Sequence, residues 1–206
     1  MKEIEIYTFG VGKQHEAGGY GVLIKDGQNK AQFAQGFQQT TTNRMQMMAC
    51  IVGLEKLREP CRVQLFSSAE YIVNSVNNGW AVKWRNHSWT RKEGPVQNVD
   101  LWKRLLYLIE RYYTTFDWIS TKVKNPYLEH CRKLAVNAMN DNEKLKDEGY
   151  HQSRETLEEW ESRQERRARR EESIAELYGY EDSDEFAFHA AFEGEVGATF
   201  GRDGWY

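Results

Sequence analysis

The chain has 206 residues and a formal net charge of −3, and 40% of its residues are hydrophobic. This length suffices for one domain with a hydrophobic core and an appendage. No stretch approaches the ~20 consecutive apolar residues of a membrane span, and the N-terminus has no apolar signal region. These features exclude a membrane-spanning protein, and we expect a soluble intracellular one without a membrane partner.

Three cysteines are present, Cys50, Cys61 and Cys131, which are too few for a disulfide framework. No Cys-x-x-Cys pair and no histidine at metal-ligand spacing accompanies them, so nothing supports a metal site built on them. We expect buried free thiols in a reducing compartment such as the cytoplasm.

The net charge hides an asymmetry along the chain. Residues 1–141 carry 19 Lys and Arg against 13 Asp and Glu, whereas residues 142–206 carry 9 against 18. The first part is therefore mildly basic and the second clearly acidic. An acidic segment can pack on a basic face of its own chain or bind a partner. It can also be a solvated helix face, which is the more common case.

The first elements predict an antiparallel meander. Residues 4–9 alternate between apolar and polar side chains, and strand-like runs follow at 18–24 and 31–37. The later elements, in chain order, are a helix that starts at Thr42 or Asn43 and runs to Arg58, a strand at 63–66, helices at about 69–78, 80–87 and 98–113, a strand at 116–119 and a helix that begins near Pro126.

Residues 143–178 are rich in Glu, Arg and Lys with a thin apolar stripe, which predicts a helical arm exposed over most of its length. Thr156 and Glu159 have the spacing of a capping box. The run Arg163 to Arg170 resembles a basic nucleic-acid patch. Because glutamates flank it on both sides, an ion-paired helix is the favoured interpretation.

Residues 179–206 form an acidic tail that contains several glycines and is rich in aromatic residues. Purely disordered tails are poor in aromatics, so we expect these rings to be buried. The sequence leaves open whether they dock on the chain's own core or on a protein partner. The candidate partner-binding residues are Phe186, Phe188, Phe192, Phe200, Trp205 and Tyr206.

Several motifs keep a fixed order and spacing through the first two thirds of the chain. They are Ile6-Tyr7-Thr8 with Gly10, Gly18-Gly19-Tyr20-Gly21, Thr41-Thr42-Asn43-Arg44-Met45, Met48-Ala49, Ala69-Glu70-Tyr71, Pro95-Val96-Gln97-Asn98-Val99-Asp100-Leu101-Trp102, Trp118-Ile119, and Pro126, Glu129, Cys131 and Leu134-Ala135. In these motifs the chain resembles ribonuclease H of the common bacterial type over about residues 1–140.

The resemblance implies an α/β fold of the ribonuclease H type, with a five-stranded mixed sheet flanked by helices on both faces. The chain would add a C-terminal helical arm and an acidic aromatic tail. The expected domains are therefore a ribonuclease H-like domain at 1–141, a charged helical extension at 142–178 and the tail at 179–206.

The resemblance also identifies five positions where the family carries acids and a histidine. In this chain they hold Phe9, Gln46, Ser68, Lys122 and Arg132. Ribonuclease H uses two divalent ions, which need carboxylate oxygens, and none of these side chains provides one. We therefore expect no catalytic residue, no metal and no cofactor, and a protein that is not an enzyme.

Other family positions suggest contact with nucleic acid. Asn43 and Asn98 match residues that reach 2′-hydroxyls and bases across the minor groove, while Thr42 and Glu70 depart from the family pattern. The segment from Trp80 resembles the basic protrusion that grips the DNA strand. The nucleic-acid-binding candidates are Asn43, Lys83, Arg85, Lys92, Asn98, Lys122 and Arg132. For Lys122 and Arg132, drift to exposed polar residues is the favoured alternative.

Three hypotheses follow. The first is a non-catalytic adaptor that contacts a protein partner through its core surface and C-terminal extension. The second is a binder that holds RNA–DNA hybrid or structured nucleic acid without metal and without cleavage. A third, another enzymatic activity in a reshaped cleft, has no residues to support it.

Overall fold

The computed structural model describes residues 2–13, 15–91 and 94–178. The chain divides into two compact units, Met1–Leu157 and Glu158–Tyr206. The candidate Lys92 and the candidate partner-binding residues of the tail lie outside the described residues, so their roles stay predictions, as do the three domains and their boundaries.

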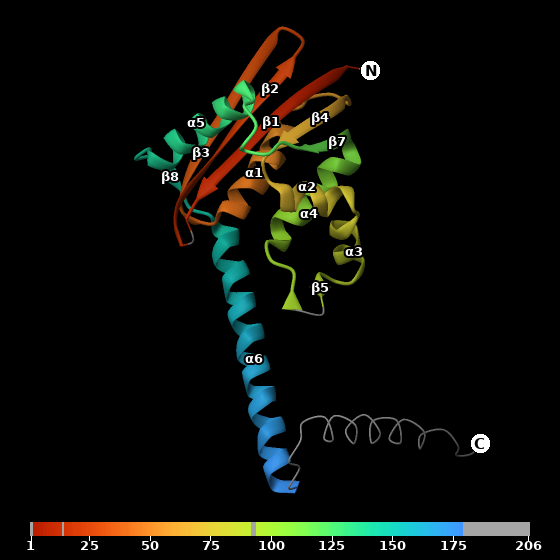
Figure 1. Ribbon diagram of the computed structural model, residues 1–206, viewed down its shortest axis with the longest axis vertical. Helices are drawn as coiled ribbons and strands as arrows, with labels where there is room; N and C mark the ends of the chain where they lie inside the picture. The colour runs from red at the N-terminus through yellow and green to blue at the C-terminus, as the bar shows by residue number, and fades with distance from the viewer. Residues whose placement is uncertain (1, 14, 92–93, 179–206) are drawn as a thin grey trace, which may run out of the picture. The chain divides into compact units, whose positions relative to one another are not determined.

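The first unit is built on a six-stranded mixed sheet with the strand order β7-β4-β1-β2-β3-β8 (Figure 1). Its first three strands, β1 (Glu3–Gly12), β2 (Glu16–Asp26) and β3 (Asn29–Thr40), form an antiparallel meander. Parallel pairing adds β4 (Arg62–Ser67) beside β1, β7 (Tyr113–Trp118) beside β4, and β8 (Lys144–Leu145) beside β3.

Helices cover both faces of this sheet (Figure 1). On one face α5 (Pro126–Asn140) contacts β1, β2 and β3. On the other face α1 (Thr42–Glu55) contacts β1 and β2 and is itself covered by α4 (Val99–Arg111). The remaining elements are α2 (Glu70–Asn77), α3 (Trp80–Asn86), the two-residue strands β5 (Thr90–Arg91) and β6 (Gly94–Pro95), and α6 (Glu148–Tyr178).

The main core lies between the sheet and α1. Nine of the fourteen residues of α1 are buried, because the sheet covers one side of the helix and α4 the other. Leu54 of α1 and Leu65 of β4 are fully buried there, as is Trp102 of α4. Each fully buried Leu stabilises the fold by about 1.5–3 kcal/mol relative to an exposed one.

On the opposite face, glycines let α5 approach the strands closely. A Cβ atom at Gly21 would lie 2.2 Å from the carbonyl oxygen of Cys131, and one at Gly36 would lie 2.0 Å from that of Ala138. Any larger residue would push the helix away from the sheet. This close approach explains why the Gly18-Gly19-Tyr20-Gly21 motif consists mostly of glycine.

The structure confirms the expected fold and the three free, buried cysteines, and it corrects three details. The sheet has six strands and not five, because β8 pairs with β3 just after α5. The helix expected to reach Arg58 ends at Glu55. Thr156 does not cap a helix: it lies inside α6, and its hydroxyl donates to the carbonyl of Gln152 at 2.9 Å.

Among the described residues, none of the helices combines the length and the apolar composition needed to cross a membrane.

Candidate nucleic-acid interface

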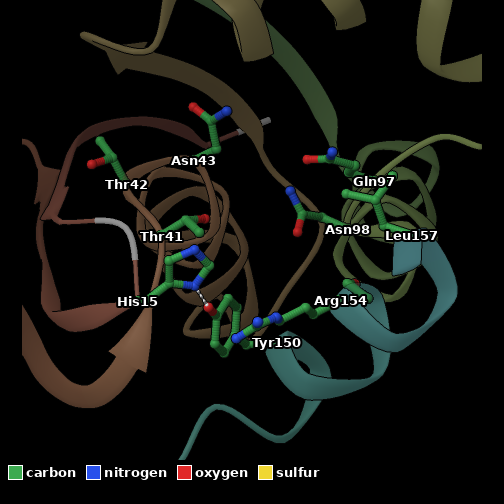
Figure 2. A pocket seen from close by; sticks show the side chains of 10 residues that line it. His15, Thr41, Thr42, Asn43, Gln97, Asn98, Tyr150, Arg154 and Leu157 are labelled. Carbon is green, nitrogen blue, oxygen red and sulfur yellow. Dashed lines mark hydrogen bonds between the residues drawn. The ribbon is translucent and has the colours of Figure 1, made fainter. Parts of the chain in front are cut away.

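A pocket of about 360 Å³ opens where the β1–β2 turn, the start of α1, the start of α4 and the first turns of α6 meet (Figure 2). Most of the residues that line it have polar side chains, and none of the described lining residues is an Asp or Glu. The residues that line it are His15, Thr41, Thr42, Asn43, Gln97, Asn98, Tyr150, Ser153, Arg154 and Leu157. All of them belong to the first compact unit.

Local sequence explains why α1 presents its first residues to this pocket. Thr41 is the N-cap of α1, and its hydroxyl oxygen accepts a hydrogen bond from the backbone N–H of Arg44 at 3.3 Å. The hydroxyl of Thr42 donates to the carbonyl of Gly12 at 2.6 Å, which joins the helix start to the end of β1. The side chain of Asn43 remains exposed at the pocket mouth.

Arg44 lies behind the pocket and is 1% exposed. Its guanidinium donates to both carboxylate oxygens of Asp147, at 2.8 Å each, and to both of Asp100, at 3.0 and 2.7 Å. Burial on its own would lower the pKa of Arg44, but hydrogen bonds to the two carboxylates outweigh it and raise the pKa. A permanent buried cation therefore fixes two acidic side chains from α4 and from the segment before α6.

The same guanidinium fixes the orientation of Asn98. Arg44 donates from Nη1 to Oδ1 of Asn98 at 3.2 Å, and since an arginine can only donate, the accepting atom must be the oxygen. The amide nitrogen of Asn98, with its two donors, is thereby left for the pocket, and Figure 2 shows it on the side of Asn43. Asn98 has a left-handed backbone (φ 57°), which asparagine tolerates, and its side chain makes no capping bond to α4.

The first turns of α6 form the remaining wall. Tyr150 is 5% exposed, and its hydroxyl is hydrogen-bonded to Nδ1 of His15 in the turn between β1 and β2 (Figure 2). Arg154 follows one helical turn later and lines the pocket on the same face of the helix. The pocket therefore has amide and hydroxyl groups on one side and a guanidinium on the other.

A second cavity, of about 450 Å³, lies beside the start of α5. Three of the five positions identified by family resemblance line it, namely Phe9, Lys122 and Arg132, together with Glu129. The carboxylate of Glu129 pairs with the guanidinium of Arg132 through two hydrogen bonds of 2.7 Å, and this contact lowers the pKa of Glu129. The ring of Phe9 packs against a small apolar cluster that includes Tyr7 and Cys131.

The other two positions do not line this cavity. Gln46 is half-buried on α1. Ser68 is half-buried too, and its hydroxyl oxygen has no hydrogen-bond partner within the part of the chain that the structure describes. The five residues are therefore only partly brought together.

The ribonuclease H resemblance implies a pair of divalent metal ions at these five positions, and the residues present do not fit them. Phe9 offers only carbon, Gln46 and Ser68 offer neutral oxygens, and Lys122 and Arg132 are cations. Within residues 2–13, 15–91 and 94–178, no group of three or more His, Cys, Asp or Glu is placed to hold a metal ion. No reaction step through a metal is derived for this chain.

The expected nucleic-acid candidates fall in three places. Asn43 and Asn98 share the polar pocket, whereas Lys122 and Arg132 share the second cavity. Lys83 and Arg85 lie exposed on α3, where Arg85 pairs with Glu110 of α4 at 2.5 Å. Of the tryptophans on this helix, Trp84 packs edge-on against Trp102 and Trp80 is 42% exposed.

Sequence reasoning missed the pocket residues His15, Thr41, Tyr150 and Arg154. His15 was not considered as a site residue, and its partner Tyr150 lies 135 residues away in the sequence. The sequence Asp147-Glu148-Gly149-Tyr150 carries a usable signal, namely an acid, a glycine and an aromatic that interrupt an otherwise charged segment.

Comparison with known proteins identifies the family. The RNase H family model matches residues 1–140. The ribonuclease H of Desulforamulus reducens is 43% identical over 140 residues, which cover 67% of this chain and 88% of that protein. The ribonuclease H of Trichodesmium erythraeum is 41% identical over 150 residues, which cover 72% and 96%. The crystal structure of LC9-RNase H1, a type 1 RNase H with the type 2 active-site motif, matches with a TM-score of 0.61 at 22% identity over 73% and 80% of the chains.

These relatives overturn the expectation of a non-enzymatic adaptor. Proteins that are 43% and 41% identical to this chain, over most of their own length, are named ribonuclease H, which points to a nucleic-acid-cleaving enzyme. The expectation was wrong because it judged the activity of the whole protein from five positions of the family's active site. The replacement of one set of metal ligands does not establish that a chain is inactive.

The family model covers β1 to β7, α1 to α5 and the polar pocket's residues on α1 and α4, and this chain belongs to the ribonuclease H family.

Proposed function

We propose that this chain acts on nucleic acid and that its ligand is an RNA–DNA hybrid, which it contacts through the polar pocket that Asn43 and Asn98 line. Membership of the ribonuclease H family supports this substrate class, and the names of the relatives point to cleavage as the reaction. The single observation that carries the proposal is the amide of Asn98, whose oxygen is held by Arg44 so that its donors face the pocket.

The chemistry of the pocket suits a sugar–phosphate backbone. Phosphate oxygens and 2′-hydroxyls accept hydrogen bonds, and most protein–nucleic acid hydrogen bonds go to such groups. Asn43, Gln97 and Asn98 carry amide donors, and Arg154 carries a guanidinium. None of the described residues that line the pocket carries a carboxylate, and the nearby Asp100 and Asp147 are both hydrogen-bonded to Arg44.

The exposed cations outside the pocket support a longer contact. Lys83 on α3 and Lys122 beside α5 are exposed, and neither forms an ion pair with a carboxylate within the described ranges. Arg85 and Arg132 are each paired with a glutamate at the surface. Because an exposed pair of this kind contributes only about 0–1 kcal/mol, a phosphate can replace the carboxylate at little cost.

The test is a binding and cleavage assay on one labelled RNA–DNA hybrid, with duplex DNA and duplex RNA of the same sequence as controls. We expect the hybrid to bind best, with an affinity that falls steeply as salt increases. RNA release in Mg²⁺ or Mn²⁺ is measured in parallel with a chelator control, and the Desulforamulus reducens relative serves as the positive control. Failure of all three duplexes to bind at low salt overturns the proposal. Binding without RNA release keeps the ligand and removes cleavage.

A further inference from the structure

We propose that the first turns of α6, residues 148–157, are an autoinhibitory strap over the surface that the hybrid contacts. A hybrid then binds fully only to chains whose strap has moved away. The inference rests on the proposed function and concerns a segment outside the region that the family model matches, which ends at residue 140. Residues 148–157 belong to α6 and to the first compact unit.

The strap is anchored at its N-terminal end. Asp147, which precedes it, is 8% exposed, accepts a hydrogen bond from the hydroxyl of Thr40 at 2.6 Å and pairs with Arg44. The next contact is close enough to require glycine: a Cβ atom at Gly149 would lie 2.1 Å from Oδ2 of Asp100 and 2.5 Å from Nη2 of Arg44. The first turn of the strap therefore lies directly against the ion pairs of Arg44.

One face of the strap is turned toward the body of the first unit. Tyr150 is 5% exposed, and Ser153 and Leu157, which share its face of the helix, are half-buried. The hydroxyl of Tyr150 is hydrogen-bonded to Nδ1 of His15 (Figure 2). This hydrogen bond fastens the strap to the turn between β1 and β2.

The strap borders two hollows that lie side by side. It forms one wall of the polar pocket, across from Asn43 and Asn98 (Figure 2). It also forms one wall of a neighbouring cavity of about 530 Å³, which residues 88–90 after α3 line as well. Ser153 and Leu157 line both hollows. A helix with its side chains is about 10–12 Å across, so the strap fills the space between the start of α1 and the segment after α3.

A duplex needs more room than the strap leaves. The grooves of a duplex are already about 6–12 Å wide. The polar pocket in front of Asn98 has about 360 Å³, which suits one group of a backbone. A hybrid that contacts Asn98 and Lys83 on α3 together must also cross the neighbouring cavity, where the strap is again a wall. Because only chains with an open strap bind fully, the apparent affinity is lowered by the open fraction.

The first experiment locks the strap with a disulfide. In the variant Asp100→Cys, Gly149→Cys the two thiols are within reach of each other, because a Cβ atom at residue 149 would lie 2.9 Å from Cγ of Asp100. The reduced form of this variant is the matched control, since both forms lack the carboxylate of Asp100. Fluorescence anisotropy at low salt measures hybrid affinity, and thermal unfolding checks that both forms are folded. We expect the oxidised form to bind at least about 10-fold more weakly, since its open fraction is removed.

The second experiment loosens the strap in the full chain. Tyr150→Phe removes the hydroxyl that bonds to His15. The control is Tyr112→Phe, which removes another buried tyrosine hydroxyl, one that donates to the carbonyl of Leu57 at 3.0 Å. We expect Tyr150→Phe to bind the hybrid about 2- to 10-fold more tightly than wild type, the range that the net contribution of one hydrogen bond allows. Tyr112→Phe should bind as wild type does.

Hydrogen exchange distinguishes a strap from an added contact surface. The backbone amides of residues 149–157 should exchange faster when saturating hybrid is added, because binding selects chains with an open strap. Slower exchange there, equal affinity of the oxidised and reduced forms, or no gain in affinity by Tyr150→Phe overturns the inference, and the proposed function stands if wild type binds the hybrid. If wild type binds no hybrid, both are overturned.

Discussion

Arg44 and Asp147 form a two-pronged ion pair, with Nε and one Nη of the arginine each 2.8 Å from a carboxylate oxygen, although 103 residues separate them. Their side chains are 2% and 7% exposed. The pair joins the start of α1 to the segment before α6, and the same guanidinium orients Asn98. The polar pocket therefore depends on a contact that no local sequence pattern encodes.

Replacing Asp147 by Asn should destabilise the fold strongly. Removing one charge leaves Arg44 buried with only Asp100 to balance it, and breaking a buried pair in this way costs about 3–5 kcal/mol. Urea denaturation should show a lower midpoint with an unchanged m value. The control is Asp141→Asn at an exposed position, which should change the free energy of unfolding by less than about 0.5 kcal/mol. Equal stability of the two variants would contradict the role given to the pair.

Asn98→Asp separates binding from stability. The carboxylate keeps an oxygen for Arg44 but turns the pocket-facing donor into a negatively charged acceptor. We expect at least a 10-fold loss of hybrid affinity at low salt, because the new charge faces the phosphate, with little loss of thermal stability. Asn98→Ala, which removes both groups, should lose affinity and stability together. Undiminished hybrid binding by Asn98→Asp would exclude the pocket as a backbone site.

Gly21→Ala tests the close approach of α5 to the sheet. The added methyl would lie 2.2 Å from the carbonyl oxygen of Cys131, so the helix has to shift, at a cost of about 1–3 kcal/mol. Gly27→Asn is the matched control in the β2–β3 turn. No atom lies within 4 Å of a Cβ there, and asparagine tolerates its φ of +58°. Chemical denaturation of both variants checks the difference, which should exceed 1 kcal/mol.

The buried thiols should respond to pH in a defined direction. Burial raises the pKa of Cys50 to about 11 and that of Cys131 to about 12. A thiol whose folded pKa exceeds its unfolded value of about 8.5 stabilises the fold fully below that value, and this contribution is lost as the pH rises toward the folded pKa. Stability should therefore fall from about pH 8.5 upward. Both thiols should resist a disulfide reagent at pH 8 until denaturant is added, and rapid labelling of the native protein would show that they are not buried.

Magnesium should not stabilise the wild-type chain beyond what matched monovalent salt does, because the five family positions provide no carboxylate. The variant Phe9→Asp, Gln46→Glu, Ser68→Asp, Arg132→Asp restores four acids. Its melting temperature should rise with Mg²⁺ concentration as mass action requires, and the rise should vanish with chelator. A Mg²⁺-dependent shift in the wild type would reveal a metal site built from other residues.

Local patterns were enough to predict most elements. The alternation in residues 4–9 predicted β1, and the threonines before Arg44 predicted the start of α1 within one residue. These predictions hold because strand alternation and helix capping depend on neighbours in the sequence. The family resemblance likewise identified Asn43 and Asn98 as candidate binding residues, since each lies in a motif that the chain shares with the family.

The pocket itself could not be predicted in this way. The strand β8 is two residues long and has no periodicity to detect, and it exists because β3 offers a free edge. Tyr150 and Arg154 lie in a segment whose composition predicts an exposed helix, yet Tyr150 is buried against His15.

The sequence by itself determined the family, the order of the elements and the replacement of the five expected metal and proton-transfer residues. Only the tertiary structure decided that Asn98 presents its amide nitrogen and that α6 contributes a wall with a cation. The reason is physical: both depend on Arg44 and His15 meeting partners more than 50 residues away, and such contacts arise from packing and not from local propensity.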